Sequence, residues 1–252
     1  MIGLMRRTAG WLVLLLLTTQ AEAAEPRDAV FVVGALHDLH AAESAFDFEG
    51  LGRVIDAIQP DVLVLEVRPD ELEGRLDTQG RPEYPAVVWP WLADHDVQAV
   101  AMEPGGAEFA RITSAAGAQI TALQARDPDA GAYRGRLRQS LETALQAYWT
   151  NAADTQNGVT ADIARSWAIT EAELVGAEFG TIQAEWDNHM LTQAQAAMRA
   201  HPGKRILVLG SYRNRAGLEA GLRPVAGGRL VDTEAWLRDQ AFGVSDEPSS
   251  ER

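Results

Sequence analysis

Ala29-Val-Phe-Val-Val-Gly-Ala-Leu36 is a continuous apolar run, rich in β-branched residues, that ends at a polar cluster. Such a run is typical of a strand that is buried on both faces, as in a parallel sheet. Val62-Leu-Val-Leu-Glu-Val67 repeats the pattern, and apolar residues at helical spacing lie between the two runs, from about 48 to 58. The chain therefore begins with a strand, a helix and a strand, an order that favours a right-handed parallel crossover.

Further along the chain, two more apolar runs extend the predicted sheet. Residues 97–102 form a third predicted strand, and residues 205–210 form a fourth. The segment 227–231 is a candidate for a last short strand. Short helices are expected at 86–94 and at 215–222.

The middle of the chain, from about 107 to 200, is dominated by Ala, Gln, Glu and Leu. This composition predicts helices, broken near Asp127-Pro128 and Asn157-Gly158. The predicted fold class is α/β, with a mostly parallel central sheet flanked by helices and a long helical insertion between the early strands and the last strands. We expect residues 24–244 to form this single domain, followed by a polar tail at 245–252.

The N-terminus has the three parts of a secretory signal peptide. Arg6-Arg7 is a basic start, residues 9–17 are apolar, and Ala21 and Ala23 form an A-x-A cleavage signal. We therefore expect residues 1–23 to be removed and the mature protein to be periplasmic or secreted. A buried first helix or a membrane anchor is the alternative, although a transmembrane helix needs about 20 apolar residues.

The composition restricts the partners and the chemistry. The 252 residues include 22 Lys and Arg against 36 Asp and Glu, for a formal net charge of −14. A chain this acidic repels nucleic acid and anionic lipid, so we expect no nucleic-acid partner and no membrane partner after signal cleavage. Because the chain has no cysteine, a metal or catalytic site must be built from His, Asp and Glu.

Polar residues stand where the predicted strands end. His37 follows the first strand, Glu66 lies at the end of the second, Glu103 follows the third and Arg213 follows the fourth. Ligands of open parallel sheets bind at this edge, so we expect the four side chains to converge there. A carboxylate inside an apolar strand is costly to bury unless it is paired or bound to a metal. The alternatives are a surface ion pair of Glu66 with Arg68 and a histidine satisfied within its own loop.

Three of these segments carry a resemblance to a known family. Val33-Gly-Ala-Leu-His37 resembles the G-x-x-H motif of the TraB/TIKI/ChaN-like superfamily, which includes the GumN proteins. Glu66-Val-Arg68 resembles its E-x-R element, and the segment from Ile206 to Arg213 stands where the family has a second G-x-x-H. The superfamily includes metal-dependent peptidases, an erythromycin-esterase-like branch that uses His and Glu without metal, and haem-associated lipoproteins.

The resemblance implies roles for individual residues. His37 would be a metal ligand or general base, Glu66 a ligand or the acid/base partner, and Arg68 an orienting or anion-holding group. Arg213 replaces the expected second histidine, and arginine does not ligate metals. His189 is the best substitute. The predicted ligand set is His37, Glu66, Glu103 and His189, for a divalent metal such as manganese, cobalt or zinc.

Some of these side chains have simpler interpretations. Glu178, Glu185 and His189 fall near one helix face, which could equally be an ordinary solvated charged face. His40 is expected to be exposed on its loop. Six aromatic residues are expected either to pack in the core or to form the wall of a pocket over the strand ends: Trp89, Trp91, Tyr148, Trp149, Trp167 and Trp186.

Two hypotheses of function follow. In the first, the protein is a hydrolase in which a metal-bound water, or a water activated by His37 and Glu66, attacks the carbonyl of a peptide or ester substrate. In the second, the same fold holds a small molecule without turnover, with Arg213, Tyr212 and Asn214 as binding residues. The sequence leaves the substrate and the oligomeric state open.

Overall fold

The computed structural model describes residues 28–78 and 80–240, so the predicted signal peptide and polar tail lie outside the described part of the chain. Its centre is a four-stranded, fully parallel sheet in the order β1-β4-β2-β3. The strands are β1 (Val30–Ala35), β2 (Val62–Leu65), β3 (Gln98–Ala101) and β4 (Ile206–Ser211). The last strand in sequence thus lies between the first two, and the predicted α/β class is confirmed.

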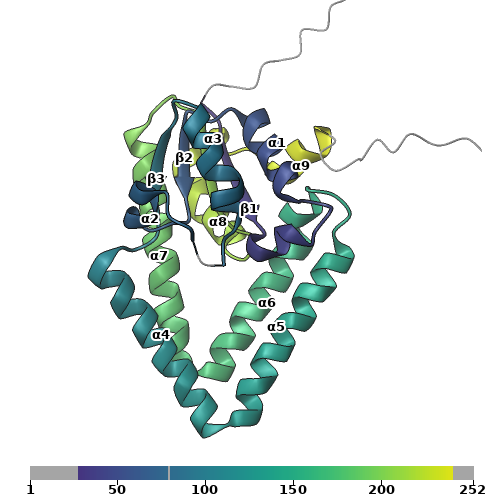
Figure 1. Ribbon diagram of the computed structural model, residues 1–252, viewed down its shortest axis with the longest axis vertical. Helices are drawn as coiled ribbons and strands as arrows, with labels where there is room; N and C mark the ends of the chain where they lie inside the picture. Colours follow the sequence, from purple (N-terminus) through teal and green to yellow (C-terminus); the bar gives the residue numbers. More distant parts are fainter. Residues whose placement is uncertain (1–27, 79, 241–252) are drawn as a thin grey trace, which may run out of the picture.

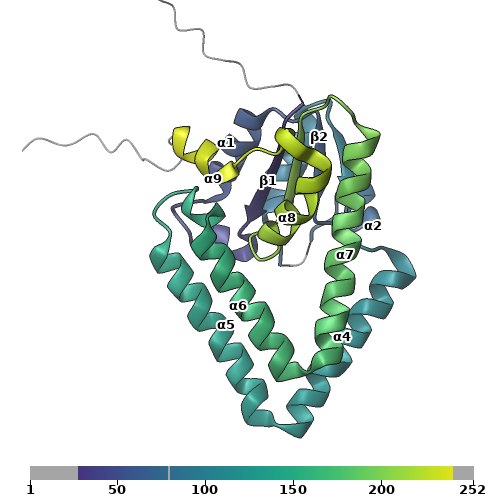
Figure 2. The ribbon, with the colours of Figure 1, turned by 180° about the vertical axis from the view of Figure 1, so that it is seen from behind.

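Alternate residues of the strands face two separate helical layers. Phe31, Leu63 and Leu207 pack on the layer of α1 (Phe48–Ile58) and α3 (Trp89–Asp94). Their neighbours pack on the opposite layer, formed by α7 (Ala177–Ala200) and α8 (Arg215–Ala226). Figures 1 and 2 show these layers from opposite sides. Burial on both faces explains why the central strands are apolar throughout.

One strand prediction was wrong. The predicted third strand does form, as β3 at the edge of the sheet, with residues that are half-buried or exposed. The segment 227–231 is not a strand. It begins with the 3-10 turn η4 (Gly227–Arg229), and Leu230 makes one isolated parallel bridge to Val30. The N–H of Val231 donates to the carbonyl of Val30 at 2.9 Å, so the segment contacts the edge of β1 without forming a strand.

The insertion consists of four helices arranged as a V (Figure 1). They are α4 (Gly106–Arg126), α5 (Pro128–Tyr148), α6 (Gly158–Val175) and α7. One arm pairs α4 with α7 and the other pairs α5 with α6, and the arms meet far from the sheet (Figure 2). The buried residues Leu123, Val175 and Phe179 form a small core at this junction.

The helix breaks in the insertion have local causes. Both predicted breaks are present. Asp127 accepts a hydrogen bond from Ala130 N at 2.9 Å and Asn157 accepts one from Thr160 N at 3.0 Å, so each caps the helix that follows it. A third break, at Gly176, was missed. Its φ of 134° favours glycine, and it is the turn that folds α7 back on α6.

Shorter elements complete the fold. They are η1 (His37–Ala41), α2 (Pro69–Gly74), the π-turn η2 (Tyr84–Val88), η3 (Asp154–Gln156) and α9 (Thr233–Asp239). Together, η2 and α3 cover the helix predicted at 86–94. Within the described ranges, every helix is too short or too polar to cross a bilayer.

Gly34 is where β1 approaches the turn after β4 most closely. A Cβ at this position would lie 2.7 Å from Tyr212 Cα, a backbone atom that cannot swing away. We expect Gly34→Ala to lower the free energy of unfolding by about 1–3 kcal/mol, as overpacking does. Gly135→Ala is the control, because this exposed helical glycine has free space around it and should gain up to about 1 kcal/mol. Urea unfolding measures both, and equal stability of the two variants would contradict the prediction.

Candidate active site at the carboxyl edge of the sheet

His37 stands directly after β1 in a restrained conformation. Its φ of 57° is unusual for a residue with a side chain, and its Nδ1 lies 2.7 Å from Glu83 Oε1. Glu83, the residue before η2, is fully buried, and 14% of the His37 side chain is exposed. A buried carboxylate on Nδ1 fixes the ring, so Nε2 is the nitrogen left for chemistry.

Glu66 faces that nitrogen. Its Oε2 accepts hydrogen bonds from the backbone N–H of Ser211 and from Asn214 Nδ2, the latter at 3.1 Å. Its Oε1 lies 4.0 Å from His37 Nε2, which is too far for a direct hydrogen bond. The two atoms are therefore separated by a gap that a water molecule or a substrate hydroxyl could bridge. The predicted convergence of β1, β2 and β4 at this pair is present.

Glu103 reaches the same edge but is occupied by Arg81. The guanidinium donates to both carboxylate oxygens, at 2.8 and 3.1 Å, and also to the backbone carbonyl of Glu66. Glu71 Oε2 lies 3.5 Å from Arg81 Nη2, which also donates to Glu103. The sequence analysis missed Arg81, which comes from the polar segment after α2. A bidentate ion pair of this kind leaves Glu103 poorly placed to serve as a metal ligand.

Arg68 turns away from His37. It lies at the N-terminus of α2, where Nη1 is 2.9 Å from Glu71 and Nη2 is 3.1 Å from Asp70, and its guanidinium stacks over Phe109. The expected catalytic role of Arg68 therefore has no support in the geometry. The alternative interpretation, an ion pair between Arg68 and Glu66, is not formed either, because Arg68 pairs with Asp70 and Glu71.

His189 lies on α7, which forms a wall of a cleft over the His37–Glu66 pair, but its side chain pairs with α4 and does not line the cleft. Its Nδ1 is 3.3 Å from Glu108 on α4, and Glu185 pairs with Arg111 of the same helix. These contacts fit the simpler interpretation, a charged helix face. Among the described residues, no group of three or more His, Asp or Glu side chains is arranged to hold a metal. The four predicted ligands do not come together.

The turn after β4 contributes unequally to the site. Asn214 and Arg213 line the cleft over the His37–Glu66 pair, whereas Tyr212 is buried in the core against Trp149. Arg213 donates to Tyr212 Oη at 3.1 Å and pairs with Glu142 of α5. This pairing anchors the turn to the insertion. Tyr212 is thus a packing residue, not the binding residue that was expected.

His40 was expected to be exposed and is instead buried. Its Nε2 accepts the N–H of Leu36 at 2.9 Å, and its Nδ1 donates to the carbonyl of Phe46 at 2.6 Å. Burial lowers the pKa of His40, which agrees with a neutral ring that accepts at one nitrogen. The residue holds together the turn that carries His37.

A cleft of about 500 Å³ opens over the His37–Glu66 pair. Its walls are the facing sides of α6 and α7, and its base is formed by residues of the sheet edge. Large apolar side chains form much of the walls: Trp167, Ile169, Phe179, Trp186 and Met190. The charged or polar side chains of Arg165, Glu171, Gln183 and Asp187 also line them. Trp167 and Trp186 thus fit the pocket-wall interpretation, and Trp89 and Trp149 belong to the core. Such a cleft suits an apolar ligand with one polar group at the base.

The site is rich in buried acid. Four buried glutamates gather around Arg81 and His37: Glu66, Glu71, Glu83 and Glu103. Burial raises the pKa of Glu103 to about 7 despite Arg81, and Glu66 adds to the rise. Burial alone would lower the pKa of His37, but the hydrogen bond and charge of Glu83 and the charge of Glu66 raise it above 6.5.

These raised pKa values predict how stability depends on pH. The folded protein binds more protons than the unfolded chain as the pH rises from 4.5, the ordinary pKa of Glu103, to about 7. Stability is therefore lost over that range, and the raised pKa values of His37 and of Asp187, the latter raised by burial to about 6, act in the same direction. The lowered pKa of His40 acts in the opposite direction. We expect the free energy of unfolding to fall by about 1–3 kcal/mol between pH 5 and pH 8. Urea titrations should show a smaller fall in Glu103→Gln, and a stability that rises with pH would contradict the assignment.

Comparison of the chain with protein-family models, with curated proteins and with solved structures found no match.

Proposed function

We propose that the protein is a hydrolase that cleaves an ester or peptide bond with His37 as general base and without a metal ion. One observation carries the proposal. The fully buried carboxylate of Glu83 holds Nδ1 of His37, and Nε2 of His37 is left for chemistry at the base of the cleft. A base oriented by a third group is the arrangement that activates nucleophiles in acyl transfer. The proposal agrees with the resemblance to the metal-free branch of the TraB/TIKI/ChaN-like superfamily.

The proposed reaction begins with a water molecule that hydrogen-bonds to both His37 Nε2 and Glu66 Oε1. His37 takes a proton from this water as its oxygen adds to the substrate carbonyl carbon. The tetrahedral intermediate then collapses, the bond to the leaving oxygen or nitrogen breaks, and His37 returns the proton to the leaving group. Glu66 orients the water, and the negative charge of Glu83 stabilises the protonated imidazole.

The walls of the cleft indicate the substrate class. Aromatic and aliphatic side chains line both helices, so the acyl or alcohol part of the substrate is apolar. The test is a screen of 4-nitrophenyl esters of increasing acyl length together with fluorogenic peptides. We expect turnover to rise with acyl length, and the His37→Ala variant to remove it.

The proposal makes a prediction about metals. Glu103 is held by Arg81 and His189 by Glu108, so neither joins His37 and Glu66. We expect protein dialysed against EDTA to keep its full activity, and added manganese, cobalt or zinc to leave the rate unchanged. Ester hydrolysis measured before and after dialysis checks this. Loss of activity with recovery on one of these metals would instead establish a metal-dependent hydrolase.

A second candidate function, ligand binding without turnover, rests on Arg213. This residue stands where the resembling family has its second histidine, and it is anchored to Glu142 rather than free to act as an acid or base. In that case esters or their acids would bind in the cleft with no product formed. Intrinsic tryptophan fluorescence reports such binding, because Trp167 and Trp186 line the cleft.

On the pattern of residues 1–23, we also propose that the protein works outside the cytoplasm.

A further inference from the structure

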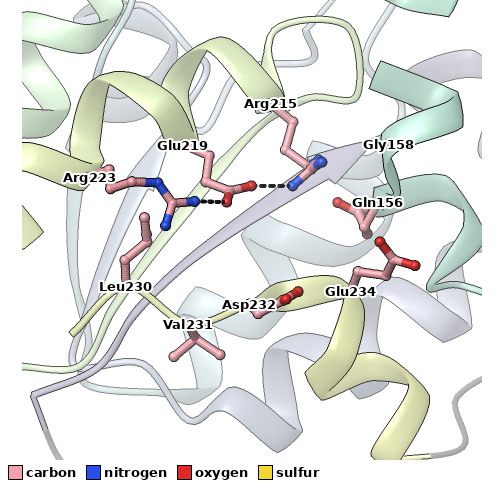
Figure 3. Close-up of a pocket in the computed structure, with 9 residues that line it drawn as sticks. All are labelled: Gln156, Gly158, Arg215, Glu219, Arg223, Leu230, Val231, Asp232 and Glu234. Atoms are coloured by element: carbon pink, nitrogen blue, oxygen red, sulfur yellow. Dashed lines mark hydrogen bonds and ion pairs between the residues drawn. The ribbon is translucent and has the colours of Figure 1, made fainter. Parts of the chain in front are cut away.

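A second pocket, of about 270 Å³, lies outside the cleft, between α8 and the segment that leads into α9. Figure 3 shows Arg215, Glu219 and Arg223 projecting from α8 on one side. Asp232 and Glu234 line the other side, beyond the chain that carries Leu230 and Val231. Five of its nine lining residues are charged, and none of the nine lines the cleft over His37.

Arg215 is the unusual residue of this pocket. Only 8% of its side chain is exposed, yet among the described residues its one hydrogen-bond partner is Glu219, 2.7 Å from Nη1. The Nε and Nη2 groups, which form the edge that recognises carboxylates in a bidentate manner, are left for a ligand. Neither nitrogen is among the fully buried side-chain atoms that lack a partner, so both can be reached from the pocket.

Glu219 does not compete for that edge. Its second oxygen accepts from Arg223 Nη2 at 2.7 Å, so the carboxylate bridges two arginines. The three side chains together carry one net positive charge. This leaves the Arg215 end of the pocket suited to an anionic group.

The opposite wall has the opposite character. Asp232 Oδ1 accepts the N–H of Ala235 and caps α9, and Glu234 Oε1 accepts from Arg238. Each carboxylate therefore keeps one oxygen that makes no hydrogen bond to the described residues. Two carboxylate oxygens facing a pocket suit an ammonium group, which has three donors.

We propose that this pocket binds a small zwitterion of the α-amino acid class, with its carboxylate on Arg215 and its ammonium on Asp232 and Glu234. The volume of about 270 Å³ is large enough for a free amino acid with a modest side chain. The site is separate from the hydrolytic cleft and shares none of its proposed catalytic residues.

The experiment is isothermal titration of the full chain with L-alanine, L-glutamine and L-phenylalanine. Acetate and methylammonium, which carry one charge each, are the matched probes. We expect saturable binding of at least one amino acid at a concentration where neither single-charge probe binds. Failure of all three amino acids to saturate would overturn the proposal, and so would acetate binding as tightly as they do, because the site would then recognise the anion alone.

Two variants test the two ends of the pocket. Arg215→Lys keeps the positive charge but loses the planar pair of N–H donors, and we expect the Kd for the amino acid to rise at least ten-fold. Glu234→Gln, at a more exposed position, keeps the shape of the side chain but loses its negative charge, and we expect the Kd for the amino acid to rise several-fold. Arg53→Lys, in an exposed ion pair with Glu49 on α1, is the control and should bind normally. If Arg215→Lys does not fold by circular dichroism, Glu234→Gln still decides, and unchanged binding in it would count against the proposal.

Discussion

Replacement of His37 by alanine is expected to lower kcat for the best ester substrate by about 10²–10⁴-fold, the usual contribution of a general base. The reason is that Nε2 of His37 faces Glu66 Oε1 at the base of the cleft, and no other histidine among the described residues lines that cleft. KM should change little, because apolar contacts on α6 and α7 supply most of the substrate binding. Steady-state kinetics with purified protein measures both constants.

The matched control is His95→Ala. His95 is exposed, stacks on Trp91 and has no contact with the site, so its loss should leave kcat unchanged. A His37→Ala variant that is folded and retains full activity would exclude His37 as the base. Circular dichroism and the urea midpoint of each variant separate loss of chemistry from loss of fold.

Replacement of Glu83 by glutamine is the second large effect, and we expect it to lower kcat by about 10²-fold or more. Glutamine retains the shape but loses the negative charge that stabilises protonated His37. The pH profile gives an independent readout. Because Glu83 raises the pKa of His37, we expect the acidic limb of kcat/KM to lie above pH 6.5 in the native protein and to move to lower pH in the variant.

Glu43→Gln is the control for this substitution. Glu43 is also a buried glutamate, but it accepts the N–H of Ala45 and lies outside the cleft. It should leave both kcat and the position of the acidic limb unchanged. An unshifted limb in Glu83→Gln would mean that the His37–Glu83 contact does not control the titration, and Glu83 would then have a structural role alone.

The sheet was predictable because its signals are local. Continuous apolar runs at β1, β2 and β4 report burial on both faces, and a run of this kind needs no knowledge of its neighbours. The strand order was harder to predict, since β4 lies between β1 and β2 although the long helical insertion precedes it in the chain. The same limit explains β3, because its sequence resembles a buried strand although the edge position leaves it half-covered.

About half of the candidate site could be predicted from the sequence. His37 and Glu66 follow strands, and the parallel register that aligns Ala35 with Ser211 brings those ends together. Glu83 and Arg81 come from an irregular segment with no periodic pattern, so their sequence neighbourhood contains no sign of a role. Arg68 and His189 were assigned by resemblance and spacing, but Arg68 pairs with Asp70 and Glu71, and His189 pairs with Glu108 of α4.

The amino-acid sequence therefore specified the α/β class, the helical insertion and the two side chains that begin the site, because each depends on residues close together in the chain. Folding specified the partners of those side chains. Glu83 reaches His37 across 46 positions and Ser211 reaches Glu66 across 145, and such contacts depend on the packing of whole elements. Burial then decides which charges stay paired, since the free energy of a carboxylate depends on all the groups around it.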